Sequence, residues 1–286
     1  MREGQIIKSI SGEYTIALGK DKIVCKPRGV FRYKGMSPKV GDIVLVNEET
    51  RSIIEIKKRK NDLIRPVIAN VDKAFLVFSV KEPELNLNLL DRMIAIIEYN
   101  NIEAVIVFTK LDLLEEKEEY FKIRDYYKKI GYTIYESSKD LLPYELLDEL
   151  KDNVCVLTGQ SGVGKSTLLN QFDSNLNIKT NEISQALGRG KHTTRHVELL
   201  SLGDGYLADT PGFGTVDFTG IDAYTLSQQF REFFEALPNC KYGQCLHINE
   251  PNCEVKRKIE NNEILKSRYE NYLLFVKEIQ ETKKKY

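Results

Sequence analysis

The chain has 286 residues, more than one domain usually takes, which predicts two or three compact units. Its 42 basic and 42 acidic side chains cancel, so any affinity for nucleic acid has to come from local patches. No apolar run approaches the roughly 18 residues of a membrane span, and the N-terminus lacks the apolar stretch of a secretory signal. We therefore expect a cytoplasmic protein with no membrane contact.

Short β-rich runs separated by turn residues occupy the first part of the chain. These predicted strands are Gln5–Ile10, Tyr14–Leu18, Ile23–Lys26, Asp42–Val46 and Ser52–Ile56. Five short strands in about sixty residues favour an OB-like barrel, although an SH3-like barrel fits the same pattern. Such a barrel either binds RNA or is a packing module. The basic run Lys57–Lys60 that follows either contacts phosphates or is a solvated loop.

Strands and helices alternate from about residue 71. Strands are predicted at Ala74–Val80, Ala104–Phe108, Thr133–Tyr135, Val154–Leu157, Val197–Leu200 and Tyr206–Ala208, with helices at Leu87–Tyr99, at Tyr120–Ile130 and from Lys165. This alternation indicates a parallel sheet with crossover helices. After Asp222 the pattern is mostly helical, so the chain combines an α/β domain with a smaller helical region.

A glycine-rich turn between a predicted strand and a predicted helix is the most specific motif. Gly159–Ser166 reads GQSGVGKS and follows the apolar strand Val154–Leu157, which is the context that a phosphate-binding loop requires. In such a loop backbone N–H groups surround a phosphate, Lys165 reaches the terminal phosphates and the Ser166 hydroxyl ligates Mg²⁺. The alternative is a tight glycine turn without a ligand.

Two further loops identify the base of the nucleotide. Thr109-Lys110-Leu111-Asp112 follows a strand, and the Asp112 carboxylate can accept hydrogen bonds from both N1–H and N2–H₂ of guanine, a donor pair that adenine lacks. The methylene stem of Lys110 can lie along the purine face. Ser137 and Ser138, after the strand Thr133–Tyr135, are placed like the loop whose backbone N–H meets guanine O6 in GTPases. An ordinary acidic turn is the alternative for each.

The motif Asp209-Thr210-Pro211-Gly212 follows a third strand and completes the predicted site. Asp209 supplies a carboxylate for Mg²⁺ through water, and the Gly212 N–H faces the γ-phosphate. The predicted nucleotide contacts are Thr109, Lys110, Asp112, Ser137, Ser138, Gly159, Gln160, Ser161, Gly162, Val163, Gly164, Lys165, Ser166, Thr167 and Gly212. Because the base-reading loops precede the phosphate loop, the order is that of a circularly permuted GTPase, which hydrolyses GTP to GDP and phosphate.

Three cysteines and a histidine cluster near the C-terminus. Cys240, Cys245, His247 and Cys253 have the spacing C-x4-C-x-H-x5-C, a closed set of four ligands that predicts one structural Zn²⁺ between two helices. Free buried cysteines beside a chance histidine are the alternative. Cys25 and Cys155 are expected to be small buried side chains.

The permuted motif order, the N-terminal barrel and the Cys/His cluster together resemble the RsgA (YjeQ) family of ribosome small-subunit-dependent GTPases over essentially the whole chain. The resemblance implies an OB-fold and a role in late maturation of the small ribosomal subunit, in contact with its rRNA. It also implies that His192 positions the attacking water and that Thr194 completes the Mg²⁺ shell, with Thr193 as an alternative ligand. An exposed loop histidine without a catalytic role is the alternative for His192, whereas Lys165 is catalytic in either case.

The prediction has three domains: an OB-fold barrel over 1–65 that binds RNA, a circularly permuted P-loop GTPase domain over 66–222, and a helical zinc-binding domain over 223–286. We expect a monomer whose hydrolysis is slow until the ribosome orders the switch around His192. Two other classes fit parts of the pattern, namely a regulatory switch acting on a protein effector and a nucleic-acid-binding module with a degenerate nucleotide pocket. Salt-sensitive binding to small subunits separates the ribosomal role from the first of these.

Overall fold

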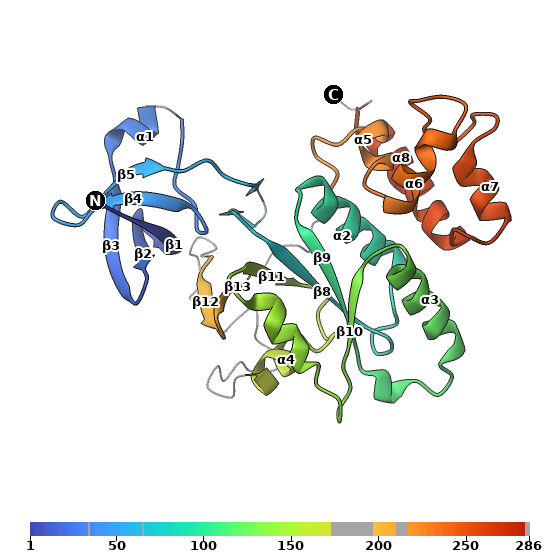
Figure 1. The fold of residues 1–286 in the computed structure, drawn as a ribbon, viewed down its shortest axis with the longest axis horizontal. Coiled ribbons are helices and arrows are strands. Elements are labelled where there is room, and N and C mark those ends of the chain that lie inside the picture. Colours follow the sequence, from blue (N-terminus) through green and yellow to red (C-terminus); the bar gives the residue numbers. More distant parts are fainter. Residues whose placement is uncertain (34, 65, 173–196, 210–216, 284–286) are drawn as a thin grey trace. The chain divides into compact units, whose positions relative to one another are not determined.

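The computed structural model describes residues 1–33, 35–64, 66–172, 197–209 and 217–283 (Figure 1). The chain divides into two compact units, Met1–Val77 with Asp140–Gly214, and Phe78–Lys139 with Thr215–Tyr286. Among the described helices, none is long and apolar enough to cross a membrane. These two units do not test the three domain boundaries expected from the sequence, and those boundaries stay predictions.

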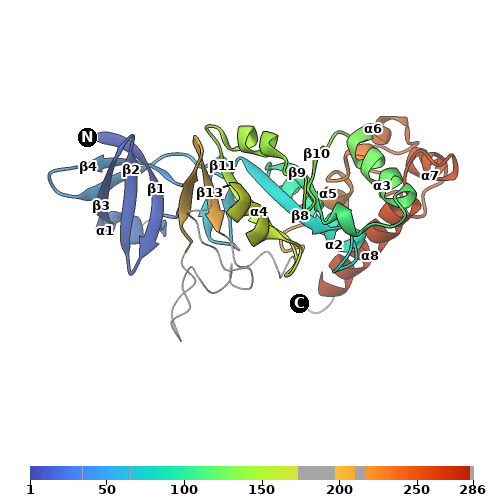
Figure 2. The same cartoon turned by 90° about the horizontal axis from the view of Figure 1, so that it is seen from below.

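The N-terminal strands close into a barrel (Figure 2). Its strands are β1 (Arg2–Ile10), β2 (Glu13–Leu18), β3 (Asp21–Pro27), β4 (Ile43–Asn47) and β5 (Ser52–Ile56), in the order β1-β2-β3-β5-β4, with helix α1 (Gly29–Tyr33) between β3 and β4. Apolar residues at alternate positions, such as Val44 and Val46 of β4, are fully buried inside the barrel. This arrangement confirms the predicted five-stranded, OB-like barrel.

The basic run after the barrel is held by acidic side chains. Arg59 donates to Asp42 from Nε at 2.7 Å and from Nη2 at 2.8 Å, and Asp42 is fully buried. Arg59 also pairs with Asp62, and Lys60 pairs with Asp72. Arg59 therefore stabilises the exit from the barrel, where β6 (Asp62–Leu63) and β7 (Ile68–Ala69) form a two-stranded sheet.

The α/β part contains one six-stranded sheet in the order β10-β9-β8-β11-β13-β12. The strands are β8 (Lys73–Ser79), β9 (Glu103–Thr109), β10 (Thr133–Glu136), β11 (Val154–Thr158), β12 (Leu199–Leu202) and β13 (Gly205–Asp209). The helices α2 (Leu87–Tyr99), α3 (Glu118–Lys129) and α4 (Lys165–Phe172) alternate with them along the chain. The pairs β10–β9, β11–β8 and β11–β13 are parallel, which confirms the predicted crossover pattern.

Strand β12 differs from the prediction in direction and in position. It pairs antiparallel with β13, with Leu202 opposite Gly205. Only Gly203 and Asp204 separate the two strands, and such a short loop makes a hairpin because a parallel connection needs a dozen or more residues. The strand begins at Leu199, so the expected start at Val197 was wrong by two residues.

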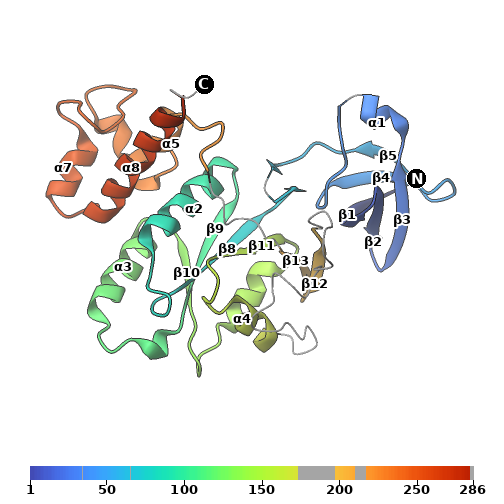
Figure 3. The same cartoon turned by 180° about the vertical axis from the view of Figure 1, so that it is seen from behind.

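The C-terminal part of the chain is helical (Figure 3). Its helices bury a core that includes several aromatic side chains. They are α5 (Ala223–Ser227), α6 (Arg231–Ala236), α7 (Glu254–Glu260) and α8 (Lys266–Lys283), and a 3-10 turn, η4 (Leu237–Asn239), extends α6. The ring of Phe233 lies 5.0 Å from that of Phe230 and 5.1 Å from that of Tyr272, between ring centroids. Such ring pairs stabilise the core beyond the area that they bury. The element bounds confirm the predicted helical region, with the three cysteines of the cluster between α6 and α7.

A buried arginine joins three helices of this unit. Arg268 of α8 forms ion pairs with Asp91 of α2, at 2.5 Å, and with Glu232 of α6. The Tyr127 hydroxyl donates to Asp91 at 2.5 Å, and the Asn271 amide donates to its other oxygen at 2.7 Å. Burial raises the pKa of Asp91 above its ordinary value, although Arg268 opposes this shift. The cluster therefore fixes α8 and α6 against α2.

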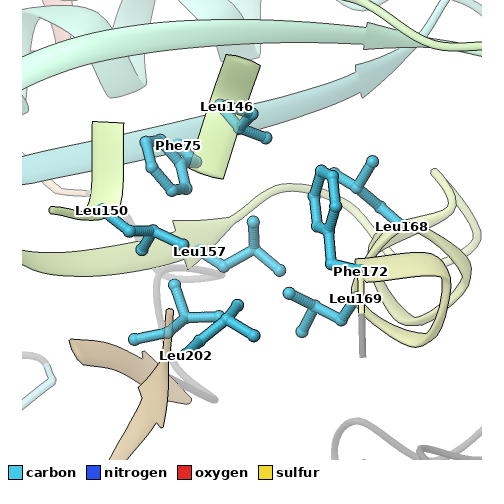
Figure 4. Close-up of a pocket in the computed structure, with 9 residues that line it drawn as sticks. Phe75, Leu146, Leu150, Leu157, Leu168, Leu169, Phe172 and Leu202 are labelled. Atoms are coloured by element: carbon cyan, nitrogen blue, oxygen red, sulfur yellow. The ribbon is translucent and has the colours of Figure 1, made fainter. Parts of the chain in front are cut away.

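Apolar side chains of the first unit converge under α4 (Figure 4). The lining residues are Phe75, Leu146, Leu150, Leu157, Leu168, Leu169, Phe172, Leu202 and Leu207, of which Leu146 and Leu150 belong to the 3-10 helix η2 (Tyr144–Leu150). The cavity between them has about 10 Å³, and a buried water needs roughly this space together with polar partners. The cavity is thus part of the packing of α4 and does not accommodate a ligand.

Candidate functional site

The glycine-rich loop connects β11 directly to α4. Gly159 has a φ of 148°, and a Cβ there would lie 2.1 Å from the Val77 carbonyl oxygen, so only glycine fits. Val163 is buried within the loop, and α4 begins at Lys165 as the motif predicts. The loop therefore ends at a helix N-terminus, where backbone N–H groups are free of helical partners and favour anions.

The two polar residues that open α4 are held differently. The Lys165 ammonium donates to the Gly159 carbonyl at 2.7 Å and to the Gln160 carbonyl at 2.5 Å, so it lies over the loop. Ser166 is buried in the first turn of α4. A cation over the loop and a hydroxyl at the helix start are the groups that phosphate and a phosphate-bound Mg²⁺ require.

The predicted base-reading loops contact each other in the second unit. Lys110 has a left-handed backbone, with a φ of 60°, at the junction between β9 and the 3-10 helix η1 (Leu111–Leu113). The Ser137 N–H donates to the Phe108 carbonyl at 2.8 Å. The Lys139 N–H donates to Oδ1 of Asp112 at 3.1 Å, and Asp112 is exposed. Thr109, Lys110 and Asp112 therefore lie beside Ser137 and Ser138.

Several predicted residues are outside the described part of the chain. His192, Thr193, Thr194 and Gly212 belong to this group, so their roles stay predictions. Asp209 is the last residue of β13.

The four residues of the Cys/His motif converge to one point. The ligand atoms of Cys240, Cys245, His247 and Cys253 all lie within 4.8 Å of one another. Nδ1 of His247 lies 3.7 Å from the sulfur of Cys240 and 3.4 Å from that of Cys253. Tetrahedral Zn²⁺, with bonds of about 2.3 Å to sulfur and 2.0 Å to nitrogen, requires about 3.5 Å between these atoms. The two distances from His247 are therefore close to those of a tetrahedral site, and three thiols with one imidazole are a donor set that suits structural zinc.

Residues that the sequence analysis missed hold the loop of this cluster. The Glu250 carboxylate accepts the N–H groups of Leu246 and Ile248, each at 2.8 Å. The Tyr269 hydroxyl of α8 donates to the His247 carbonyl at 2.7 Å. An acidic residue three positions after His247 was the only signal in the sequence, because the contact with α8 depends on how the helices pack.

Burial shifts the pKa of two groups in the cluster toward their neutral forms. It raises the pKa of the Cys245 thiol to about 12 and lowers that of His247 to about 4. A neutral imidazole is the form that binds metal, whereas the thiols have to lose protons when a metal binds. Cys25 in β3 of the barrel and Cys155 in β11 are also buried, as expected.

The fold and motif order define the class of this protein as a circularly permuted P-loop GTPase. Its structure is similar to "YloQ, a circularly permuted GTPase", with 37% identity and a TM-score of 0.83, covering 99% of this chain and 96% of the other. It is also similar to YjeQ from Thermotoga maritima, with 34% identity and a TM-score of 0.82 over 98% of each chain.

The chain belongs to the RsgA GTPase family and is a GTP-hydrolysing enzyme. The family model for the RsgA GTPase matches residues 54–219, and that for the RsgA N-terminal domain matches residues 3–53. The chain is 46% identical to the small ribosomal subunit biogenesis GTPase RsgA 2 of Oceanobacillus iheyensis, with 100% of both chains covered. The relative from Bacillus subtilis is 44% identical with the same coverage and carries the name small ribosomal subunit biogenesis GTPase RsgA.

Proposed function

We propose that this protein binds the small ribosomal subunit and its rRNA, acts late in maturation of that subunit, and hydrolyses GTP in response. The observation that carries the proposal is the match over full length to relatives named for small-subunit biogenesis, on a chain with a barrel, a GTPase fold and a Cys/His cluster. A barrel of this type is a frequent nucleic-acid-binding module. A factor with this role acts in the cytoplasm, and we propose that it acts as a monomer.

The nucleotide is held at two places. The loop Gly159–Ser166 and Thr167 surround the phosphates with backbone N–H groups, and Lys165 supplies the cation. The carboxylate of Asp112 accepts two hydrogen bonds from guanine, and the loop at Ser137 and Ser138 supplies an N–H for O6. The contacts between these two base-reading loops support this role because they fix the carboxylate before the base arrives.

Magnesium and water complete the reaction chemistry. Ser166, Asp209 and Thr194 would hold Mg²⁺, which neutralises charge on the phosphates when it is bound. Gly212 donates its N–H to the γ-phosphate, and His192 orients the attacking water. Phe213, which follows Gly212, has no group that can orient water. Hydrolysis therefore depends on His192, and we expect it to be slow until binding of the small subunit brings His192 to the water.

The Cys/His cluster holds one structural Zn²⁺ through Cys240, Cys245, His247 and Cys253. The loop that carries these ligands has few apolar residues, so the metal stabilises its fold. Four protein ligands leave no open position for catalysis. We assign the barrel to 1–65, the GTPase domain to 66–222 and the zinc-binding domain to 223–286.

GTP hydrolysis by the purified protein, measured with and without small ribosomal subunits, tests this function. We expect strong stimulation by the subunits and its loss in Lys165→Ala, because the phosphates lose their cation. Asp112→Asn is expected to lose the preference for guanine. The control Asp140→Asn makes the same chemical change at an exposed acidic residue with no predicted nucleotide contact, and it is expected to keep the preference for guanine.

Different outcomes of this experiment test the ribosomal role and the nucleotide site. Turnover that is equally fast with and without small subunits would leave a GTPase but overturn the ribosomal role. Unchanged turnover in Lys165→Ala would overturn the assignment of the phosphate loop. Binding to small subunits that weakens steeply with salt supports rRNA contact, since each phosphate contact releases counterions.

A further inference from the structure

A short loop beside the base-reading residues is held from three sides. This loop, residues 80–86, connects the end of β8 to the start of α2. The Ser79 hydroxyl donates to the Pro83 carbonyl at 2.7 Å, and Ser79 is 2% exposed. The Lys110 ammonium donates to the Glu82 carbonyl. At the far end the Asn86 side chain accepts the Leu89 N–H at 2.9 Å and so caps α2.

The same loop lies at the carboxyl edge of the sheet, next to the strand that carries Lys110. The Val80 N–H donates to the Thr109 carbonyl at 3.1 Å, and the Thr109 hydroxyl donates to the Phe78 carbonyl at 3.4 Å. These bonds join the ends of β8 and β9. Ligands of open α/β sheets bind outside this edge, which places the loop 80–86 at the border of the proposed base site.

These contacts fix where the Lys110 side chain lies. Its ammonium is held at one end by the Glu82 carbonyl, and its backbone is held at the other end by the left-handed turn after β9. A free lysine side chain has four rotatable bonds, and ordering it on binding costs free energy. Because Ser79 holds the loop that presents the Glu82 carbonyl, Ser79 acts on Lys110 through the backbone.

We propose that Ser79 is a positioning residue for the guanine site: through the loop 80–86 it pre-orders the methylene stem of Lys110 as one wall for the purine. This inference rests on the proposed nucleotide function and names a residue that contributes to it without touching the base. A preformed wall strengthens binding of GDP and GTP by the same factor, because both carry the same base. It leaves the choice of base with Asp112.

The test is a titration of the full-length protein with a fluorescent N-methylanthraniloyl derivative of GDP and of GTP. Ser79→Ala is expected to bind both nucleotides about fivefold more weakly, the effect of losing one hydrogen bond that orders the site. Ser79→Thr keeps the hydroxyl and is expected to recover most of the affinity. Turnover at saturating GTP is expected to change by less than twofold.

A matched control separates positioning from stability. Ser227 of α5 is also 2% exposed, and its hydroxyl donates to the Tyr224 carbonyl at 2.7 Å. Ser227→Ala therefore removes an equivalent bond from the same unit away from the base-reading loops, and is expected to bind nucleotide as the parent does. Lys110→Met keeps the apolar stem and loses the ammonium, so adding Ser79→Ala to it is expected to weaken binding no further.

Three results would overturn the inference. One is a Ser79→Ala variant with the affinity of the parent, and another is an equal loss in Ser227→Ala. The third is a fully additive effect of Ser79→Ala and Lys110→Met, since independent effects mean that Ser79 does not act through Lys110. A parent protein that binds neither derivative would instead refute the proposed nucleotide site itself, so the two failures are distinguishable.

Discussion

Replacement of Arg268 tests whether the buried charge cluster holds the C-terminal helices. Arg268→Met keeps much of the apolar length and removes the cation. Asp91 and Glu232 are then left as buried carboxylates, with side chains 1% and 6% exposed. Removing one partner of a buried ion pair costs about 3 to 5 kcal/mol, because the remaining charge stays uncompensated.

The contacts that remain place the expected loss at the lower end of that range. Asp91 keeps the hydroxyl of Tyr127 and the amide of Asn271, and Glu232 keeps the Tyr126 hydroxyl at 3.1 Å. We therefore expect a loss of about 3 kcal/mol at neutral pH, which corresponds to a melting midpoint roughly 10 °C lower. The chain has no tryptophan, so circular dichroism or tyrosine fluorescence follows the unfolding.

The stability loss in Arg268→Met depends on pH, and the pKa of Asp91 decides in which direction it changes. Burial raises the pKa of Asp91 in the folded protein, and Arg268→Met removes a cause that lowers it, so this pKa rises further. A raised carboxyl pKa means that the ionised form destabilises the fold, and this penalty shrinks as pH falls toward the unfolded value of about 3.9. The loss of stability relative to the parent is therefore smaller at pH 5 than at pH 7.5.

Two further variants complete this test. Asp91→Asn in the Arg268→Met background is expected to recover part of the stability, because it removes one uncompensated charge. Arg257→Met makes the same chemical change at an exposed pair with Glu254 on α7 and is expected to leave the midpoint unchanged. An Arg268→Met protein as stable as the parent, or a loss that does not shrink with falling pH, would refute the reasoning.

Three shorter predictions concern the other parts of the chain. Gly159→Ala is expected to abolish nucleotide binding in equilibrium titrations, because its Cβ would lie 2.1 Å from the Val77 carbonyl oxygen; undiminished affinity would contradict this. Cys253→Ser is expected to reduce zinc below one equivalent by elemental analysis, and a full equivalent would count against the ligand set. Arg59→Met is expected to lower the melting midpoint, since Asp42 is left buried and unpaired, whereas Lys58→Met, at an exposed position, is not.

The sequence by itself determined the elements and motifs that depend on local pattern. The five barrel strands follow from short β-rich runs between turn residues, and the start of α4 at Lys165 follows from a glycine-rich turn after an apolar strand. The spacing of the Cys/His motif likewise predicted that four ligand atoms meet at one place. In the structure they lie within 4.8 Å of one another. In each case neighbours along the chain carry the physical information, so no knowledge of the packing was needed.

Only the tertiary structure decided the contacts between distant segments. Asp91 and Arg268 are separated by 177 positions, and no local pattern distinguishes them from solvated charges on helices. Arg59 belonged to a basic run that fitted a phosphate contact equally well until its pairing with Asp42 was seen. Ser79 is an ordinary strand residue in the sequence. Ion pairs and buried hydroxyl bonds depend on which elements pack together, because partners across a fold are chosen by three-dimensional proximity and by the cost of burying an unpaired polar group.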